Sequence, residues 1–509
     1  MRNPEDRSAD SKCDSHGGEI ASDGMDKKCY DEDYAAVDPA YLSPDQQIKA
    51  DEVGTTVAAQ AGAAPLVEGS LWRAIWTMSW PLTMTTVATS ICGMVDVQVS
   101  GTIGSSAQAA VGLAEQVIFL FMLFIMSLGI GTTAIVSRAY GERDEAQADY
   151  MAGQSLTLSV LSGIVLTVLA LMTARYLVPL FTKSPDVVAQ GDLYLSVFAL
   201  YMVPFSMVCI VNASFRAIGN ARIPLLIVLT EVIVNILGDY LTVIGNWPVP
   251  HLGIRGIAYS AVAGAVLAAI VAIIFIARSP LKRCTTMLLP VSLTAIQRVL
   301  KLGIPSAFQR ISWAASVFVL FFILSRVPDP TPALASWTIG MRVEALLFMP
   351  LMALSLAVSS IVGQNLGAKE IGRAFKAGWH VTWIGVAMML ILGTAMYIFA
   401  TELAQFMSHD SQTIVYTSSY LRINAYCEPF LAINMILSGA LQGAGDTRVP
   451  MWASVFGNWV VRLPLAWFLA IYLGWGPSGA WWAMTTSILV STAIVAVRFQ
   501  TGGWVHQRV

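Results

Sequence analysis

Four polar side chains stand inside long apolar stretches of the chain, where a charged group is costly. Asp96 lies in one such stretch, and Glu231, Asn235 and Asp239 lie in another. A carboxylate at the centre of a membrane-spanning helix costs about 2.5 to 3.5 kcal/mol, so it needs a partner or a purpose. Carboxylate and amide oxygens suit a hard cation such as sodium, and a buried carboxylate can instead carry a proton. The sequence leaves both ions open.

The spacing of these side chains indicates that they meet in one pocket. Glu231, Asn235 and Asp239 follow each other at helical intervals of four, which places them on one face of a helix. At about 1.5 Å per residue, Asp96 and Asp239 both fall in the outer half of the membrane. We therefore predict a sodium or proton site at Asp96, Asn235 and Asp239, with Glu231 as a secondary candidate. The alternative is that Asp96 and Asp239 form a structural hydrogen-bonded pair.

The composition fixes the kind of scaffold that must hold these residues. The chain is 56% hydrophobic and only 12% charged, whereas about a quarter of the residues are charged in soluble proteins. An apolar layer of about 30 Å requires about 20 helical residues, and open sheet edges would leave backbone groups unsatisfied there. The sequence therefore predicts an all-α integral membrane protein.

Twelve apolar stretches are long enough to span a membrane, and they fall into two groups of six. We place the first six near 75–100, 111–137, 154–180, 193–217, 222–246 and 254–278, and the second six near 304–326, 333–363, 378–400, 415–441, 450–473 and 479–498. The predicted organisation is an N-lobe over 71–280, a linker over 281–303, a C-lobe over 304–500 and a short C-terminus over 501–509.

The first 70 residues differ from the rest, with 15 Asp and Glu against 6 Lys and Arg and no sustained apolar period. This composition predicts a disordered acidic tail over 1–70. It has neither the basic start nor the apolar core of a secretory signal. The six cysteines show no metal-binding spacing, and neither zinc nor a disulfide framework is indicated.

Basic residues are distributed unequally between the predicted loops. If the tail is cytoplasmic, the inner loops hold fifteen Lys and Arg and the outer loops hold four, which are Arg175, Lys183, Arg255 and Arg326. This asymmetry predicts a multi-pass protein of the plasma (inner) membrane with both termini in the cytoplasm.

One short segment occurs twice in the chain. Phe215 to Pro224 (FRAIGNARIP) is echoed by Leu441 to Pro450 (LQGAGDTRVP), 226 positions later. Because each half has six spans, both halves enter the membrane in the same direction as parallel repeats. Carriers bind substrate between such repeats, near the bilayer midplane. The alternative is that the duplication merely made a larger bundle.

The repeated scaffold does not repeat its polar residues. The same offset pairs Asn235 with Val461 and Asp239 with Leu465. The sequence therefore predicts ion coupling in the N-terminal half alone.

The second half carries charges of mixed sign within or beside its spans, at Arg310, Arg342, Glu344, Arg422, Glu428 and Arg462. Arg342 and Glu344 are two positions apart and do not share a helix face. Arg342 and Glu344 are secondary candidates for the functional site. A purely structural role is the equal alternative for both. The 15 Trp and 22 Met are numerous enough to line a cavity for bulky apolar cations as well as to pack the core.

The sequence contains no catalytic or nucleotide-binding motif typical of soluble enzymes. It has no phosphate-binding glycine loop with a lysine and no H-E-x-x-H motif, and it has only 5 His. We therefore expect neither an enzyme nor an ATPase, no cofactor and no nucleic-acid partner. Energy would come from an ion gradient.

Several motifs together resemble the MATE (multidrug and toxic compound extrusion) transporters. They are G-A-G-D-T-R-V-P over 443–450, V-G-Q-N-L-G-A over 362–368, G-M-R-V-E over 340–344, and Pro81 with Asp96. The resemblance covers about 71–500. It implies two six-helix lobes around a V-shaped cleft, and export of organic cations or drugs in exchange for sodium or protons.

The resemblance also bears on the site residues. Asp96, Asn235 and Asp239 match the N-lobe cation site of the DinF-like branch. Trp313 stands where another branch has an acid, which argues against coupling through the C-lobe. A threonine common in the sixth span is replaced here by Ser260 or Ala261.

We therefore expect a monomeric secondary active exporter of amphipathic or cationic small molecules, surrounded by membrane lipid, with Pro81 and Pro204 as bending points. One rival is a lipid-linked oligosaccharide flippase, which would need Arg310, Arg342 and Arg462 to converge on the cleft. A second rival is a non-transporting membrane scaffold that recruits basic partners through the acidic tail.

Overall fold

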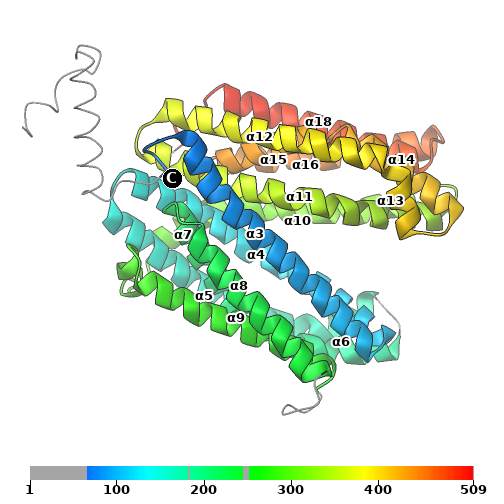
Figure 1. Ribbon diagram of the computed structural model, residues 1–509, viewed down its shortest axis with the longest axis horizontal. Helices are drawn as coiled ribbons and strands as arrows, with labels where there is room; N and C mark the ends of the chain where they lie inside the picture. The colour runs from blue at the N-terminus through cyan, green and yellow to red at the C-terminus, as the bar shows by residue number, and fades with distance from the viewer. Residues whose placement is uncertain (1–65, 182–183, 245–251, 508–509) are drawn as a thin grey trace, which may run out of the picture. The chain divides into compact units, whose positions relative to one another are not determined.

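The computed structural model describes residues 66–181, 184–244 and 252–507, and every regular element in these ranges is helical (Figure 1). The predicted acidic tail lies outside the described residues up to position 65. Beyond that point, Leu66 is already buried in a hydrophobic core.

The first half of the chain contains six spans. They are α3 (Leu71–Ile103), α4 (Ser105–Gly141), α5 (Glu145–Phe181), a composite of α6 (Pro185–Phe198), η3 (Ala199–Tyr201) and α7 (Met202–Ala217), α8 (Arg222–Asp239) continued by the π-helical η4 (Tyr240–Ile244), and α9 (Ile254–Ala277).

The second half follows a short 3₁₀ turn, η5 (Lys282–Thr285), and again contains six spans. They are α10 (Leu293–Leu324), α11 (Pro330–Gly367), α12 (Ile371–Ile398) followed by α13 (Ala400–Met407), α14 (Ser411–Ala425) with α15 (Glu428–Gly443), a composite of α16 (Arg448–Val455), η6 (Phe456–Arg462), α17 (Leu463–Trp467) and η7 (Phe468–Tyr472), and α18 (Pro477–Gln500).

The prediction of twelve spans in two lobes is confirmed, with one span interrupted. Eleven helices of the described residues are long and apolar enough to cross a membrane. The remaining span, predicted at 415–441, is divided into α14 and α15 between Ala425 and Glu428. Pro429 follows at the start of α15 and has no N–H to continue the ladder of α14, so a new helix begins there.

Helix α10 begins much earlier than the span predicted at 304–326. The side chain of Ser292 accepts a hydrogen bond from the backbone N–H of Ala295 and so caps the helix at Leu293. Much of the segment predicted as a linker is therefore the first part of α10.

The first part of the first helix of each half packs in the hydrophobic core of the other half. Ala74, Ile75 and Met78 of α3 are buried in a core made mainly by α11, α12 and α15. Val299 and Leu302 of α10 are buried in a core made mainly by α4, α5 and α7. In Figure 1, α3 crosses from the neighbourhood of α12 to that of α8 along its length. The lobes are therefore joined by exchanged helices as well as by the linker.

The duplicated segment adopts the same backbone in both copies. Gly219 and Gly445 have φ values of 85° and 89°. The next residue donates its backbone N–H to an equivalent carbonyl in each copy, Asn220 to Phe215 at 2.9 Å and Asp446 to Leu441 at 2.8 Å. Both helices therefore end in a turn that requires a left-handed residue, which explains the glycine.

The backbones of the two lobes approach closely where α4 crosses α11. A Cβ added to Gly141 would overlap the backbone carbonyl of Gln364, and a Cβ added to Gly367 would overlap that of Arg138. The offset of 226 relates Gly141 to Gly367 and Arg138 to Gln364, so the contact is reciprocal. We call these four residues the α4–α11 crossing.

The crossing predicts that Gly141 tolerates no side chain. In Gly141→Ala the methyl group meets a backbone carbonyl that cannot rotate away, so we expect overpacking to cost about 1 to 3 kcal/mol. The measurement is the thermal unfolding temperature of the purified protein in detergent, which should fall. Gly112→Ala is the matched control in the same helix, because its added Cβ meets nothing within 4 Å. Equal unfolding temperatures for the two variants would contradict the close approach.

Candidate functional site

Helices α8 and α9 pack closely at three glycines, and this contact positions the polar face of α8. A Cβ on Gly264 of α9 would lie 2.7 Å from the backbone carbonyl of Glu231 and 3.6 Å from the Cβ of Asn235. A Cβ on Gly238 of α8 would lie 2.7 Å from the hydroxyl of Ser260, and Gly256 faces Thr242 in the same way. The small residues bring α9 directly against the face that carries Glu231, Asn235 and Asp239.

The structure brings Asp96, Asn235 and Asp239 together between α3 and α8. Asp239 is 0% exposed and Asn235 is 7% exposed. The carboxyl of Asp96 interacts with that of Asp239, and the hydroxyl of Ser260 also interacts with Asp239. The helical spacing read from the sequence therefore describes a real cluster, and Ser260, not Ala261, is its member from α9.

The oxygens of this cluster lack hydrogen-bond donors. Among the described residues, neither carboxylate oxygen of Asp239 has a hydrogen-bond partner, and the same holds for Oδ1 of Asp96 and Oδ1 of Asn235. Ionised carboxylates are acceptors only, and two of them side by side in a buried site repel each other. The arrangement therefore requires either a cation between them or a proton on one of them.

The atoms of this cluster that could bind a cation are all oxygens, which a hard cation prefers as ligands. Within the described residues, no group of three or more His, Cys, Asp or Glu is arranged to hold a metal ion. The residues present fit sodium or a proton, with Asp96, Asp239, the Asn235 amide oxygen and Ser260 as the available groups.

Glu231 lies one turn from Asn235, toward the start of α8, and has a partner of its own. The phenol of Tyr201 donates a hydrogen bond of 2.6 Å to Oε1 of Glu231. The ring of Tyr201 is held in a stack with Phe198 and Phe205, at centroid distances of 5.1 Å and 5.3 Å. A neutral donor fixes Glu231 without neutralising it, so this carboxyl stays available for protonation.

A fourth acid adjoins the site and was not among the residues predicted for it. Glu115 of α4 interacts with the carboxyl of Asp96. Its signal was present in the sequence, because it is an acid within the apolar stretch predicted at 111–137. The N-lobe thus gathers acids from α3, α4 and α8.

The second half contains a buried polar cluster, which the repeat comparison did not predict. Glu344 of α11 lies next to Tyr420 and Arg462, and Glu428 lies next to Glu344. Arg462 is 6% exposed, and its Nε donates to Ser487 Oγ at 3.2 Å. The two carboxyls have a guanidinium within their own cluster, whereas no arginine in the described part of the chain interacts with Asp96 or Asp239. The prediction that ion coupling is confined to the first half stays a prediction, and the second half holds a polar cluster of its own.

The remaining arginines do not gather in one place. Arg342 is exposed on α11, whereas Arg462 is buried within the second lobe. Arg310 of α10 interacts with Cys209 of α7. Trp313 is 40% exposed on α10 and takes no part in the polar clusters. The three arginines that a flippase would need in one cavity are therefore distributed over separate surroundings.

Comparison with known proteins identifies the family to which this fold and site belong. A family model described as MatE matches residues 81–241 and 305–468, which are corresponding parts of the two halves. The chain belongs to the MatE family. This MatE chain is therefore a membrane transporter and not an enzyme, as predicted.

Curated relatives match more than four fifths of this MatE chain. It is 26% identical over 416 residues to "Probable multidrug resistance protein NorM" of Thermotoga maritima, covering 81% of this chain and 88% of the relative. It is 28% identical over 458 residues to a protein of the same name from Rhodopseudomonas palustris, covering 86% and 94%.

The fold is also similar to solved structures of MATE proteins. One is described as an "Outward-facing conformation of a multidrug resistance MATE family transporter of the MOP superfamily", with a TM-score of 0.80 at 21% identity, covering 87% of this chain and 99% of the other. At this identity the likeness establishes the shared fold.

The contact between Tyr201 and Glu231 predicts a stabilising role for the phenol in this MatE protein. Tyr201→Phe removes the donor and leaves a half-buried carboxyl oxygen unpaired, which costs about 1 kcal/mol or more. We expect a lower thermal unfolding temperature in detergent. Tyr259→Phe on the neighbouring α9 is the control, because Tyr259 is 47% exposed. A Tyr201 variant as stable as the control would show that the hydrogen bond is not formed in the folded protein.

Proposed function

We propose that this protein is a secondary active exporter of amphipathic or cationic small molecules, driven by antiport of sodium or protons. The observation that carries the proposal is the pair formed by the half-buried Asp96 and the buried Asp239: among the described residues, Oδ1 of Asp96 and both carboxylate oxygens of Asp239 lack a hydrogen-bond partner. Membership of the MatE family and the names of its multidrug-resistance relatives support the substrate class. The coupling ion is sodium or a proton, and no other cofactor is needed.

We further propose that the protein lies in the plasma (inner) membrane with both termini in the cytoplasm, as the loop charges predict. The α4–α11 crossing would then lie on the cytoplasmic side, and a cleft between the lobes would open to the outside. One chain contains both lobes, so a monomer suffices for transport.

The coupling would act through α3. Its first part is buried in the core of the second lobe, and its later part carries Asp96 against α8 of the first lobe. Pro81 lies between these parts, and a proline removes a backbone hydrogen bond from the helix. A cation or proton at Asp96 and Asp239 relieves their repulsion and favours one position of α3 against α8. Its departure favours another position.

A lipophilic cation would compete with the coupling ion in the same electrostatic field. An incoming organic cation stabilises ionised carboxylates, so it lowers the affinity of the site for sodium or a proton. By linkage the ion weakens binding of the substrate by the same factor. This reciprocal competition is what antiport requires.

The alternatives receive less support. A flippase for anionic lipid-linked oligosaccharides would favour a cavity lined by arginines, but Arg310, Arg342 and Arg462 have separate surroundings and the N-lobe cluster is acidic. A non-transporting scaffold is disfavoured by membership of a transporter family. We therefore retain ion-coupled export.

The test is dye export from proteoliposomes in which sodium and proton gradients are imposed separately. Asp96→Asn and Asp239→Asn each remove one charge at nearly constant volume, so we expect export driven by the coupling ion to fall to the level of empty liposomes. Asp192→Asn is the matched control, because Asp192 is an exposed acid of the same lobe. Undiminished export by both Asp96 and Asp239 variants would contradict the proposal.

A further inference from the structure

The C-terminal segment Thr501–Gln507 connects the two lobes at the α4–α11 crossing. We call this segment the C-terminal strap. It leaves the end of α18 in the second lobe and reaches Arg138 of α4 in the first lobe, where the backbone carbonyl of Gln507 accepts a hydrogen bond of 2.6 Å from Arg138 Nη1. The backbone carbonyl of this same Arg138 faces Gly367 in the crossing.

A buried tryptophan anchors the strap to the second lobe. Trp504 is 0% exposed and stacks on Phe499 with a centroid distance of 4.9 Å and an interplanar angle of 5°. Its indole N–H donates to the backbone carbonyl of Phe499 at 2.8 Å. Phe499 in turn stacks on Phe375 of α12 at 5.4 Å. The strap is therefore fixed to α18 and α12 and cannot be displaced without exposing a large aromatic surface.

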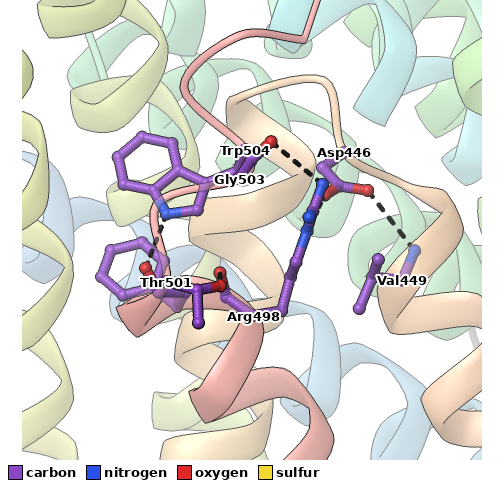
Figure 2. A network of polar contacts seen from close by, with 7 residues as sticks. Asp446, Val449, Arg498, Thr501, Gly503 and Trp504 are labelled. Carbon is purple, nitrogen blue, oxygen red and sulfur yellow. Dashed lines mark hydrogen bonds and ion pairs between the residues drawn. The ribbon is translucent and has the colours of Figure 1, made fainter.

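An ion pair ties the strap to the second copy of the repeated segment. Arg498 Nε donates to Asp446 Oδ2 at 2.8 Å, and Arg498 Nη2 donates to the backbone carbonyl of Gly503 at 3.0 Å (Figure 2). Asp446 is only 3% exposed, and its other oxygen accepts from the backbone N–H of Val449. One guanidinium thus holds both the strap and the turn before α16.

This arrangement exists only in the second lobe. Asn220 is the repeat equivalent of Asp446, and its side-chain oxygen accepts from the backbone N–H of Ile223 just as Asp446 accepts from Val449. Asn220 carries no charge, and the offset of 226 relates Arg498 to Ala272. The second copy of the repeat therefore makes an ion pair for which the first copy has no equivalent residues.

We propose that the C-terminal strap is a latch that stabilises the conformation in which α4 and α11 are in contact. Opening this end of the bundle must separate Gly141 from Gln364 and Gly367 from Arg138. Because the strap moves with the second lobe and Arg138 moves with the first, the bond between Gln507 and Arg138 must break in the same step. The inference rests on the antiport proposed above, which requires the lobes to open alternately to the two sides of the membrane, but it concerns residues remote from the acid pair.

The test is the distance between two spin labels at this end of the bundle, measured by double electron–electron resonance. Ala146→Cys on α5 and Gly372→Cys on α12 are repeat equivalents, and both positions are exposed. The labels are placed in a background whose native cysteines are replaced and which still yields monodisperse protein. The reconstituted protein is measured without substrate, so the result does not depend on which compound or ion is transported.

Two variants should increase the fraction of molecules with a longer distance between the two spin labels. Arg138→Met keeps the aliphatic stem but removes the donor, and Trp504→Ala removes the anchor. We expect each variant to raise the population with separated labels by about tenfold relative to the parent. This is the change in an equilibrium that the loss of one hydrogen bond from a charged donor produces.

Two controls isolate the bond. Gln507→Ala keeps the backbone carbonyl that Arg138 contacts, so it should match the parent. Glu142→Gln removes the partner of Arg138 at 3.5 Å on its own helix and should also match. The proposal is overturned if Arg138→Met and Trp504→Ala both leave the parent distribution unchanged, or if the two controls shift it as much as Arg138→Met does.

Discussion

The rest of the structure depends on the backbone contact between α4 and α11. Two glycines related by the internal repeat, Gly141 and Gly367, let each helix approach a carbonyl of the other. A contact of this kind has no tolerance for a side chain, so it is either formed or broken and cannot be adjusted gradually. It provides a fixed point on which the exchanged helices α3 and α10, and the C-terminal strap, are arranged.

The acid pair of Asp96 and Asp239 is linked to the second lobe through α3. Asp96 belongs to a helix that begins in the core of the second lobe and reaches Asp239 in the first. Asp239 is buried and Asp96 is half-buried, and placing these two carboxylates side by side without a compensating cation or proton is unfavourable. A change of charge at this site therefore acts on α3, one of the two helices that belong to both lobes.

Much of this could be predicted from the sequence, because it depends on local patterns. The apolar stretches gave the spans, the echo of Phe215 to Pro224 gave the repeat, and the spacing of Asn235 and Asp239 gave one side of the site. Other features depend on side chains that are distant in sequence and meet only after folding. The electrostatic interactions of Glu344 with Arg462 and of Glu115 with Asp96, and the hydrogen bond from Arg138 to Gln507, are of this kind. The interruption of the span at 415–441 before Pro429 was not predicted, because the pattern of apolar residues does not reveal the loss of a backbone hydrogen bond.

The central claim is that the acid pair exchanges an ion for the substrate. Its most direct test is to add a lipophilic cation such as ethidium to the purified protein in weakly buffered detergent and to measure the protons or sodium ions released. The account predicts release from the parent protein, and none from a variant in which Asp96 and Asp239 are both asparagine although it still binds the dye. Equal release from the two proteins would contradict it.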